Sequence, residues 1–191
     1  MANSLDYDCF GFKTFSFWRV SFIFYLLPFA FCLLLSAAIK AQDEEPPNAA
    51  PPPVKVITKA EKTALDSESD VKYHTRLAVD LMEAHLKKAE ELAAQEAYNG
   101  MFTELGGFHA LMDDTIRFLN KNNVDSGRVL DNFKRFEMAL RSFTPRIELI
   151  RRELPEKFEF YVRKLLKIVR DTRAKAIEPM FSDKIVPTAG N

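Results

Sequence analysis

One run of apolar residues constrains the fold of this 191-residue chain more than any other feature. Between positions 129 and 154 its members are spaced alternately four and three residues apart: Val129, Phe133, Phe136, Leu140, Phe143, Ile147, Ile150 and Leu154. Because an α-helix has 3.6 residues per turn, this spacing keeps one apolar seam on a helix for about seven turns. Such a seam must pack against other helices, either of the same chain or of a second copy in a homodimer.

A proline lies inside this predicted helix. Pro145 has no backbone N–H to donate, and its ring meets the carbonyl group of Arg141. The sequence therefore predicts a kink between Ser142 and Pro145.

Three further helical patterns surround the seam. They cover residues 58–98 (or 70–98), 101–119 and 155–178. Thr58 and Glu61 have the spacing of a capping box, and Asp70 is the alternative start of the first helix. Pro155 suits the first position of the last helix, and Pro179 ends it. Because long helices with short connections favour antiparallel neighbours, we expect an all-α, up-and-down bundle of three or four long helices.

Glycines are expected to mark pauses between these helices. Asn99-Gly100 is a typical helix stop, and Gly106-Gly107 weakens the start of the second helix, so its ordered part is expected to begin near Phe108. The bundle is expected to span residues 58–179, with a flexible tail at 180–191.

The first 41 residues have the pattern of an export signal. Lys13 and Arg19 precede 20 uncharged residues, 20–39, and small residues follow. This pattern predicts a signal peptide that is cleaved after Ala41, or after Ala38. The alternative is a retained anchor, since 20 helical residues can cross a hydrocarbon core of about 30 Å. Both readings place the remaining chain outside the cytoplasm, in the periplasm or the extracellular space.

Residues 42–57 are expected to form a proline-rich linker. Five of the twelve residues from Gln42 to Pro53 are proline. Such a segment favours an extended conformation and is expected to bury no apolar surface. It is interpreted either as a spacer that holds the domain off a membrane or as a disordered amino-terminus left after cleavage.

The charges of the chain are balanced in number but not in position. Residues 56–127 contain 8 basic and 13 acidic side chains, a net charge of −5, whereas residues 128–175 contain 14 and 7, a net charge of +7. One interpretation is that the two halves attract each other inside the bundle. The other is a basic surface for an anionic partner, such as phospholipid headgroups, a cell-wall polymer or an acidic protein.

The candidate residues of that basic surface are Arg151, Arg152, Arg163, Lys167 and Arg170. The last three share one face of the fourth helix, and the first two lie at the turn before it. Nucleic acid is not an expected partner, because an exported chain with no nucleic-acid-binding motif has no reason to contact it.

Few residues suggest chemistry. The histidines are His74, His85 and His109, and the methionines that could pair with them on haem are Met82, Met101, Met112 and Met138. The Glu-x-x-His motif of di-iron bundles is missing, no cysteine follows Cys32, and no nucleophile elbow or phosphate-binding loop is present. Methionines on apolar helix faces usually fill cores. We therefore expect no catalytic site, no metal and no cofactor.

Taken together, these patterns predict an exported, non-catalytic helical bundle of the cell envelope. It would act as a binding or scaffold module for a protein or for an anionic envelope component. The alternative is a periplasmic bundle that binds haem or a metal through His85 or His109.

Overall fold

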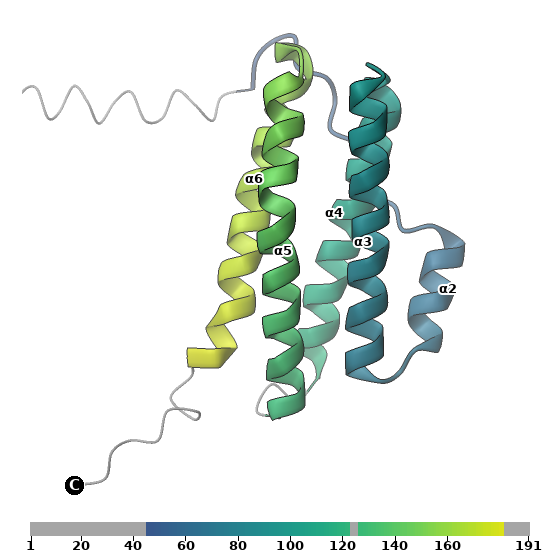
Figure 1. The fold of residues 1–191 in the computed structure, drawn as a ribbon, viewed down its shortest axis with the longest axis vertical. Coiled ribbons are helices and arrows are strands. Elements are labelled where there is room, and N and C mark those ends of the chain that lie inside the picture. Colours follow the sequence, from purple (N-terminus) through teal and green to yellow (C-terminus); the bar gives the residue numbers. More distant parts are fainter. Residues whose placement is uncertain (1–44, 123–125, 182–191) are drawn as a thin grey trace, which may run out of the picture. The chain divides into compact units, whose positions relative to one another are not determined.

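The computed structural model describes residues 45–122 and 126–181, and these form a helical bundle (Figure 1). The helices are α2 (Lys59–Ser67), α3 (Val71–Ala94), α4 (Tyr98–Lys121), α5 (Gly127–Glu153), α6 (Glu156–Ile177) and the short 3₁₀ helix η2 (Glu178–Phe181). The four long helices α3 to α6 make the bundle, and α2 lies against α3. The predicted all-α bundle is therefore confirmed.

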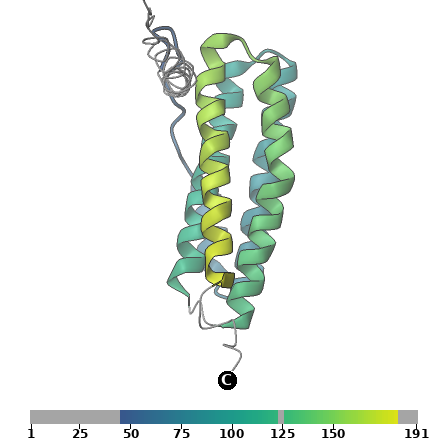
Figure 2. The ribbon, with the colours of Figure 1, turned by 90° about the vertical axis from the view of Figure 1, so that its left-hand side faces the viewer.

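Consecutive long helices run in opposite directions, so α3–α4 and α5–α6 form two antiparallel hairpins (Figure 1 and Figure 2). The hairpins pack with α3 beside α5 and α4 beside α6, and the helices of each such pair point the same way. Asp70, which precedes α3, pairs at 3.9 Å with Arg128 in the first turn of α5. Phe102 near the start of α4 packs on Tyr161 near the start of α6, with 5.3 Å between ring centroids.

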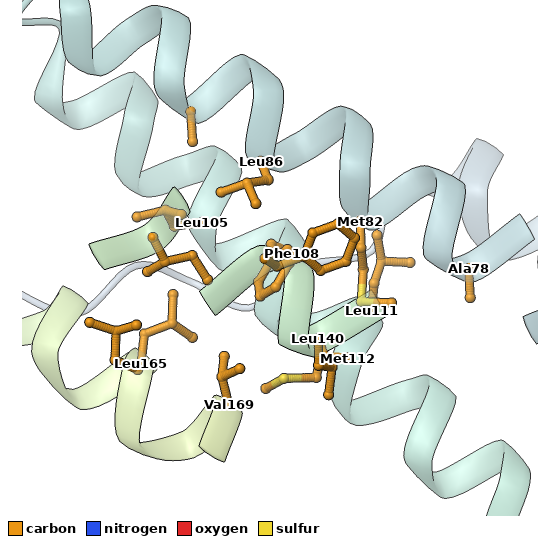
Figure 3. Packing of buried hydrophobic residues seen from close by; sticks show 14 of the residues in the cluster. Ala78, Met82, Leu86, Leu105, Phe108, Leu111, Met112, Leu140, Leu165 and Val169 are labelled. Carbon is orange, nitrogen blue, oxygen red and sulfur yellow. The ribbon is translucent and has the colours of Figure 1, made fainter. Parts of the chain in front are cut away.

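The apolar seam forms the central strip of the core. Its first seven residues are almost completely buried, and Leu154 is partly buried. Leu140 points into a cluster with Phe108, Met112 and Val169 from the neighbouring helices (Figure 3). The seam is therefore covered by helices of the same chain.

The segment predicted as one helix from residue 58 or 70 forms two helices, α2 and α3. Each of the two predicted starts begins one of them. Thr58 caps α2 in a reciprocal capping box with Glu61. Asp70 caps α3, where its carboxylate accepts hydrogen bonds from the backbone N–H groups of Lys72 and Tyr73 at 2.8 and 3.1 Å. Each cap satisfies N–H groups that have no partner within their own helix.

The prediction that Asn99-Gly100 ends the first helix is wrong. Helix α3 stops at Ala94, because Glu96 adopts the left-handed conformation with φ of 57°. The N–H of Ala97 then donates to the carbonyl of Leu92 at 2.9 Å, and the N–H of Glu96 donates to the carbonyl of Ala93 at 2.9 Å. These are the two bonds of a Schellman motif, formed here without glycine.

The prediction that Gly106-Gly107 weakens the second helix is also wrong, because α4 runs through both glycines. A Cβ at Gly106 would lie 2.4 Å from the carbonyl oxygen of Val54, and a Cβ at Gly107 would lie 2.6 Å from Cε1 of His85. The two glycines therefore allow a backbone segment and a histidine ring to pack directly on the helix.

The proline-rich segment packs on the bundle, contrary to the expectation that it buries no apolar surface. Ala50 is only 7% exposed, and its N–H donates to the carbonyl of Lys157 at 2.8 Å. Ile57 packs against the core, and Lys55 pairs with Asp113 of α4 at 2.9 Å. The compact unit accordingly begins at Pro46, while its first helix begins at Lys59. We call residues 46–67, which end with α2, the arm.

The remaining predictions concern the ends of the chain and Pro145. Helix α5 is continuous through Pro145, and the expected kink stays a prediction. Pro155 is the N-cap residue of α6, one position before its first helical residue, and η2 follows α6 with Met180 against the core, so residues 180 and 181 are not part of a flexible tail. The predicted signal or anchor and residues 182–191 lie outside the described residues. Within the described ranges, no helix is both long and apolar enough to span a membrane.

Candidate functional site

His85 lies between carboxylates from two other helices. Its Nδ1 is 2.6 Å from Oε2 of Glu104 on α4, and its Nε2 is 2.9 Å from Oε1 of Glu61 on α2. The histidine side chain is 15% exposed. A neutral imidazole has a single N–H, whereas an imidazolium has two, so only the charged ring can donate to both carboxylates.

The hydrogen bonds and the charge around Glu61 favour its ionised form. Its second oxygen accepts hydrogen bonds from the N–H and from the hydroxyl group of Thr58, each at 2.8 Å. Burial raises the pKa of Glu61, but the Thr58 hydrogen bonds and the charge of His85 outweigh burial and bring the pKa below its ordinary value. Near neutral pH, Glu61 is therefore an acceptor for the Nε2–H group of His85.

His109 belongs to a chain of polar contacts that links the arm to α6, in which His109 and Tyr161 are buried and Lys55 and Asp113 are partly exposed. Its Nδ1 is 3.3 Å from the hydroxyl oxygen of Tyr161, and its Nε2 is 3.6 Å from Oδ2 of Asp113, which binds Lys55 of the arm. Burial lowers the pKa of His109, opposed by the charge of Asp113 and assisted by that of Lys55. Burial, with the charge of Asp113, raises the pKa of Tyr161. Both rings are therefore held neutral.

His74 binds the carboxyl-terminal end of α2. Its Nδ1–H donates to the carbonyl oxygens of Leu65 and Glu68 at 3.0 and 3.2 Å, and its ring stacks on Phe118 with centroids 3.5 Å apart. Carbonyl oxygens only accept, so the proton is on Nδ1. Within the described ranges, Nε2 is buried without a hydrogen-bond partner.

The three histidines thus have a common role that their positions in the sequence do not reveal. His74 and His85 bind α2, and His109 binds the residue that pairs with Lys55, so all three connect the arm to the bundle. Of the methionines considered for haem, three are buried core residues and Met138 is 57% exposed. In the part of the chain that the structure describes, no group of three or more His, Cys, Asp and Glu side chains could hold a metal ion.

The two arginines predicted at the α5–α6 turn differ in their surroundings. Arg151 is held by Glu148 at 2.7 Å and by Glu159 of α6, and its side chain is 26% exposed. Arg152 is 67% exposed and lies 3.3 Å from Glu148. Arg151 is therefore largely neutralised within the bundle, whereas Arg152 faces solvent.

The other three predicted residues form a row on α6. Arg163 lies over the ring of Phe160 at 5.6 Å, and Arg170 is exposed, with its Nε 3.4 Å from the carbonyl oxygen of Leu166. Lys167 is exposed between them. The structure therefore keeps this row together on one side of the bundle.

Sequence reasoning missed a second part of this surface, on α5. Between positions 134 and 152, six exposed residues fall within about 80° of that helix at about 100° per residue, and the exposed Asp131 lies on the same side one turn earlier. We call them the outer α5 face: Lys134, Met138, Arg141, Pro145, Leu149 and Arg152. Met138 and Leu149 are 57% and 58% exposed. Apolar residues that lie off the buried seam were the signal that could have identified this face.

Ion pairs between the hairpins support the interpretation that the acidic and basic halves attract each other. Arg146 of α5 donates two hydrogen bonds to Glu90 of α3, both at 2.7 Å, and a third to Glu83 at 2.5 Å. This fork geometry matches the guanidinium group to the carboxylate. The charge asymmetry therefore contributes to packing of the two hairpins. The residues of the outer α5 face, Lys167 and Arg170 are exposed, and Arg163 is partly exposed.

Comparisons with models of protein families, with curated proteins and with solved structures find no match to this chain.

Proposed function

We propose that this chain is an exported, non-catalytic binding module whose outer α5 face and α6 row bind the surface of an anionic phospholipid membrane. The observation that carries the proposal is the outer α5 face, where two exposed apolar side chains lie among three exposed cations. Apolar side chains that enter a headgroup region, surrounded by basic residues that attract anionic lipids, are characteristic of peripheral membrane binding.

The geometry of the outer α5 face supports this proposal. Met138 and Leu149 are eleven residues apart, close to three helical turns, with Pro145 between them. Arg141 is 65% exposed and Arg152 is 67% exposed, so their surface ion pairs leave both guanidinium groups accessible to lipid phosphates.

The α6 row adjoins this face. Glu137 lies one turn before Arg141, and it pairs at 2.9 Å with Arg173, which lies about one turn after Arg170. This ion pair joins α5 and α6 beside the two sets of basic residues, which supports a shared binding surface. Each Lys or Arg near an anionic membrane contributes roughly 1 kcal/mol to binding at low ionic strength.

The expected export signal supports the proposed location. Residues 20–39 are the most apolar stretch of the chain, and residues from 42 on are proposed to lie outside the cytoplasm. A retained anchor would place the bundle next to a membrane surface. A cleaved signal would leave the outer α5 face as its means of membrane attachment.

Cosedimentation with vesicles tests this function. The compact unit, residues 46–191, is mixed with vesicles of phosphatidylglycerol and phosphatidylcholine, or of phosphatidylcholine alone, at rising salt concentration. Met138→Ser combined with Leu149→Ser removes two half-exposed side chains, each worth about 1 kcal/mol on insertion, so binding should weaken by about 30-fold. Tyr73→Ser, which removes a side chain 56% exposed on α3, is the matched control and should bind like the parent.

Two results would contradict the proposal. One is equal binding of the parent and the double variant to anionic vesicles. The other is an absence of vesicle binding at low salt together with salt-sensitive binding to polyglutamate, which would assign the surface to an acidic protein.

A further inference from the structure

We propose that Met138 is a site of reversible oxidation by hydroperoxides, and that its conversion to methionine sulfoxide weakens the binding of the bundle to the membrane. This inference rests on the proposed membrane binding and adds a means of regulating it. It concerns the outer α5 face, where Met138 lies between Lys134 and Arg141 along the helix.

Exposure singles out Met138 among the sulfur-containing side chains of the bundle. The sequence has no cysteine after Cys32, so methionine is the only residue of the bundle that carries sulfur. Three methionines are fully buried core residues, at 0% exposure: Met82, Met101 and Met112. Met180 is partly buried against the core, whereas Met138 is 57% exposed. A thioether must meet the peroxide in solvent to react, so among the described methionines Met138 should react first.

The reaction transfers one oxygen atom and two electrons. The sulfur lone pair of Met138 attacks one oxygen of the hydroperoxide, so that an S–O bond forms and the O–O bond breaks. The leaving hydroxide or alkoxide takes the proton that the transferred oxygen carried, and it departs as water or an alcohol. Sulfur is oxidised and the peroxide is reduced. Methionine sulfoxide reductases reverse the change with two thiols, which become a disulfide while the oxygen leaves as water.

Oxidation changes the polarity of the outer α5 face but not its charge. The sulfoxide group is neutral and strongly polar, so its insertion among lipid headgroups and acyl chains is less favourable than that of the thioether. Lys134 and Arg141 lie four residues before and three residues after Met138, so both are its neighbours on the helix surface. Membrane binding should therefore lose the apolar contribution of Met138 and keep the contribution of the cations.

The fold does not depend on the Met138 side chain. Its neighbours on the seam, Phe136 and Leu140, are fully buried, but Met138 points away from the core that the structure describes. Oxidation of Met138 should leave the free energy of unfolding unchanged. Oxidation of a buried methionine such as Met112 would instead place a polar group in the core and destabilise the bundle.

Limited oxidation with hydrogen peroxide tests the site. The compact unit, residues 46–191, is used because it contains the whole described core. Peptide mass spectrometry should find the first added oxygen atom on Met138. Cosedimentation with phosphatidylglycerol vesicles should then show binding weakened by about fivefold, the share of one side chain in the loss expected for the double variant. This factor should be the same at each salt concentration, because the charge is unchanged.

Met138→Leu is the decisive variant, because it keeps an apolar side chain that peroxide does not oxidise. It should bind vesicles like the parent both before and after treatment. Met180→Leu is the matched control, and it should lose binding after treatment as the parent does. Incubation of the oxidised parent with two methionine sulfoxide reductases, one for each sulfoxide epimer, should restore binding.

Three outcomes would overturn the inference. One is a first oxygen atom on Met180 or on a buried methionine. Another is unchanged vesicle binding once Met138 is oxidised. The third is an equal loss of binding in Met138→Leu and in the parent. Failure of the proposed function gives a different result: the unoxidised parent does not bind anionic vesicles, so there is no binding to regulate, while mass spectrometry still decides whether Met138 is oxidised first.

Discussion

Gly106→Ala would test the close packing of the arm on α4. Both Gly100 and Gly106 lie inside this helix, but only Gly106 faces backbone of the arm. A Cβ at Gly106 would lie 2.4 Å from the carbonyl oxygen of Val54, which is too close, whereas a Cβ at Gly100 would lie 3.3 Å from the tip of the Leu92 side chain. Gly100→Ala is therefore the matched control.

The expected magnitudes follow from two opposing effects. Replacing glycine by alanine inside a helix stabilises it by about 1 kcal/mol, and this gain applies at both positions. At Gly106 the Val54 carbonyl must move by at least 0.6 Å, from 2.4 to 3.0 Å, and such overpacking costs about 1–3 kcal/mol. The Gly106 variant should therefore be less stable than the Gly100 variant by about 1–3 kcal/mol.

Urea denaturation followed by circular dichroism measures the two free energies of unfolding. Hydrogen exchange of peptides from residues 54–67 shows whether the loss of stability is located in the arm. We expect faster exchange of these peptides in Gly106→Ala and not in Gly100→Ala. If both variants gain the same stability and exchange of the arm is unchanged, the arm does not lie against α4 and the explanation of Gly106 is wrong.

Three further predictions concern single side chains. Glu96→Gly should raise the free energy of unfolding by about 0.5–1 kcal/mol, because glycine adopts a φ of 57° without strain; a less stable variant in urea denaturation would contradict this. Glu137→Ala should cost about 2 kcal/mol in the same assay, since it leaves the Arg173 guanidinium, 24% exposed, without its carboxylate; an unchanged midpoint would refute it. The lowered pKa of His109 means that its contribution is complete above about pH 6.5 and is lost as pH falls below that value. Unfolding measured from pH 5 to 7 should therefore depend less on pH in His109→Asn, and equal slopes would argue against a neutral buried ring.

The features that were predicted correctly from the sequence are determined by residues close together in the chain. The seam from Val129 to Ile150 is buried as predicted, because the alternation of four and three residues is a property of one helix. Thr58 and Asp70 begin helices because each side chain caps N–H groups two or three residues ahead.

The candidate surface was predicted only in part. The α6 row of Arg163, Lys167 and Arg170 was found from its spacing, which is again a property of one helix. The partners of Arg151 could not be foreseen, since Glu159 reaches it from the next helix. Met138 and Leu149 were missed because the seam alone was searched for apolar residues.

The sequence by itself determined that this chain forms long amphipathic helices and where most of them begin, since helical periodicity and capping act over a few residues. Only the tertiary structure decided what Gly106, Gly107 and the histidines do. His85 meets Glu61 and Glu104, which are 24 and 19 residues away along the chain, and Gly106 meets Val54 across the arm. These residues seemed to be helix breakers or isolated polar groups because their partners are brought close only by packing. A contact between distant segments depends on the positions of both segments, and no local pattern contains that information.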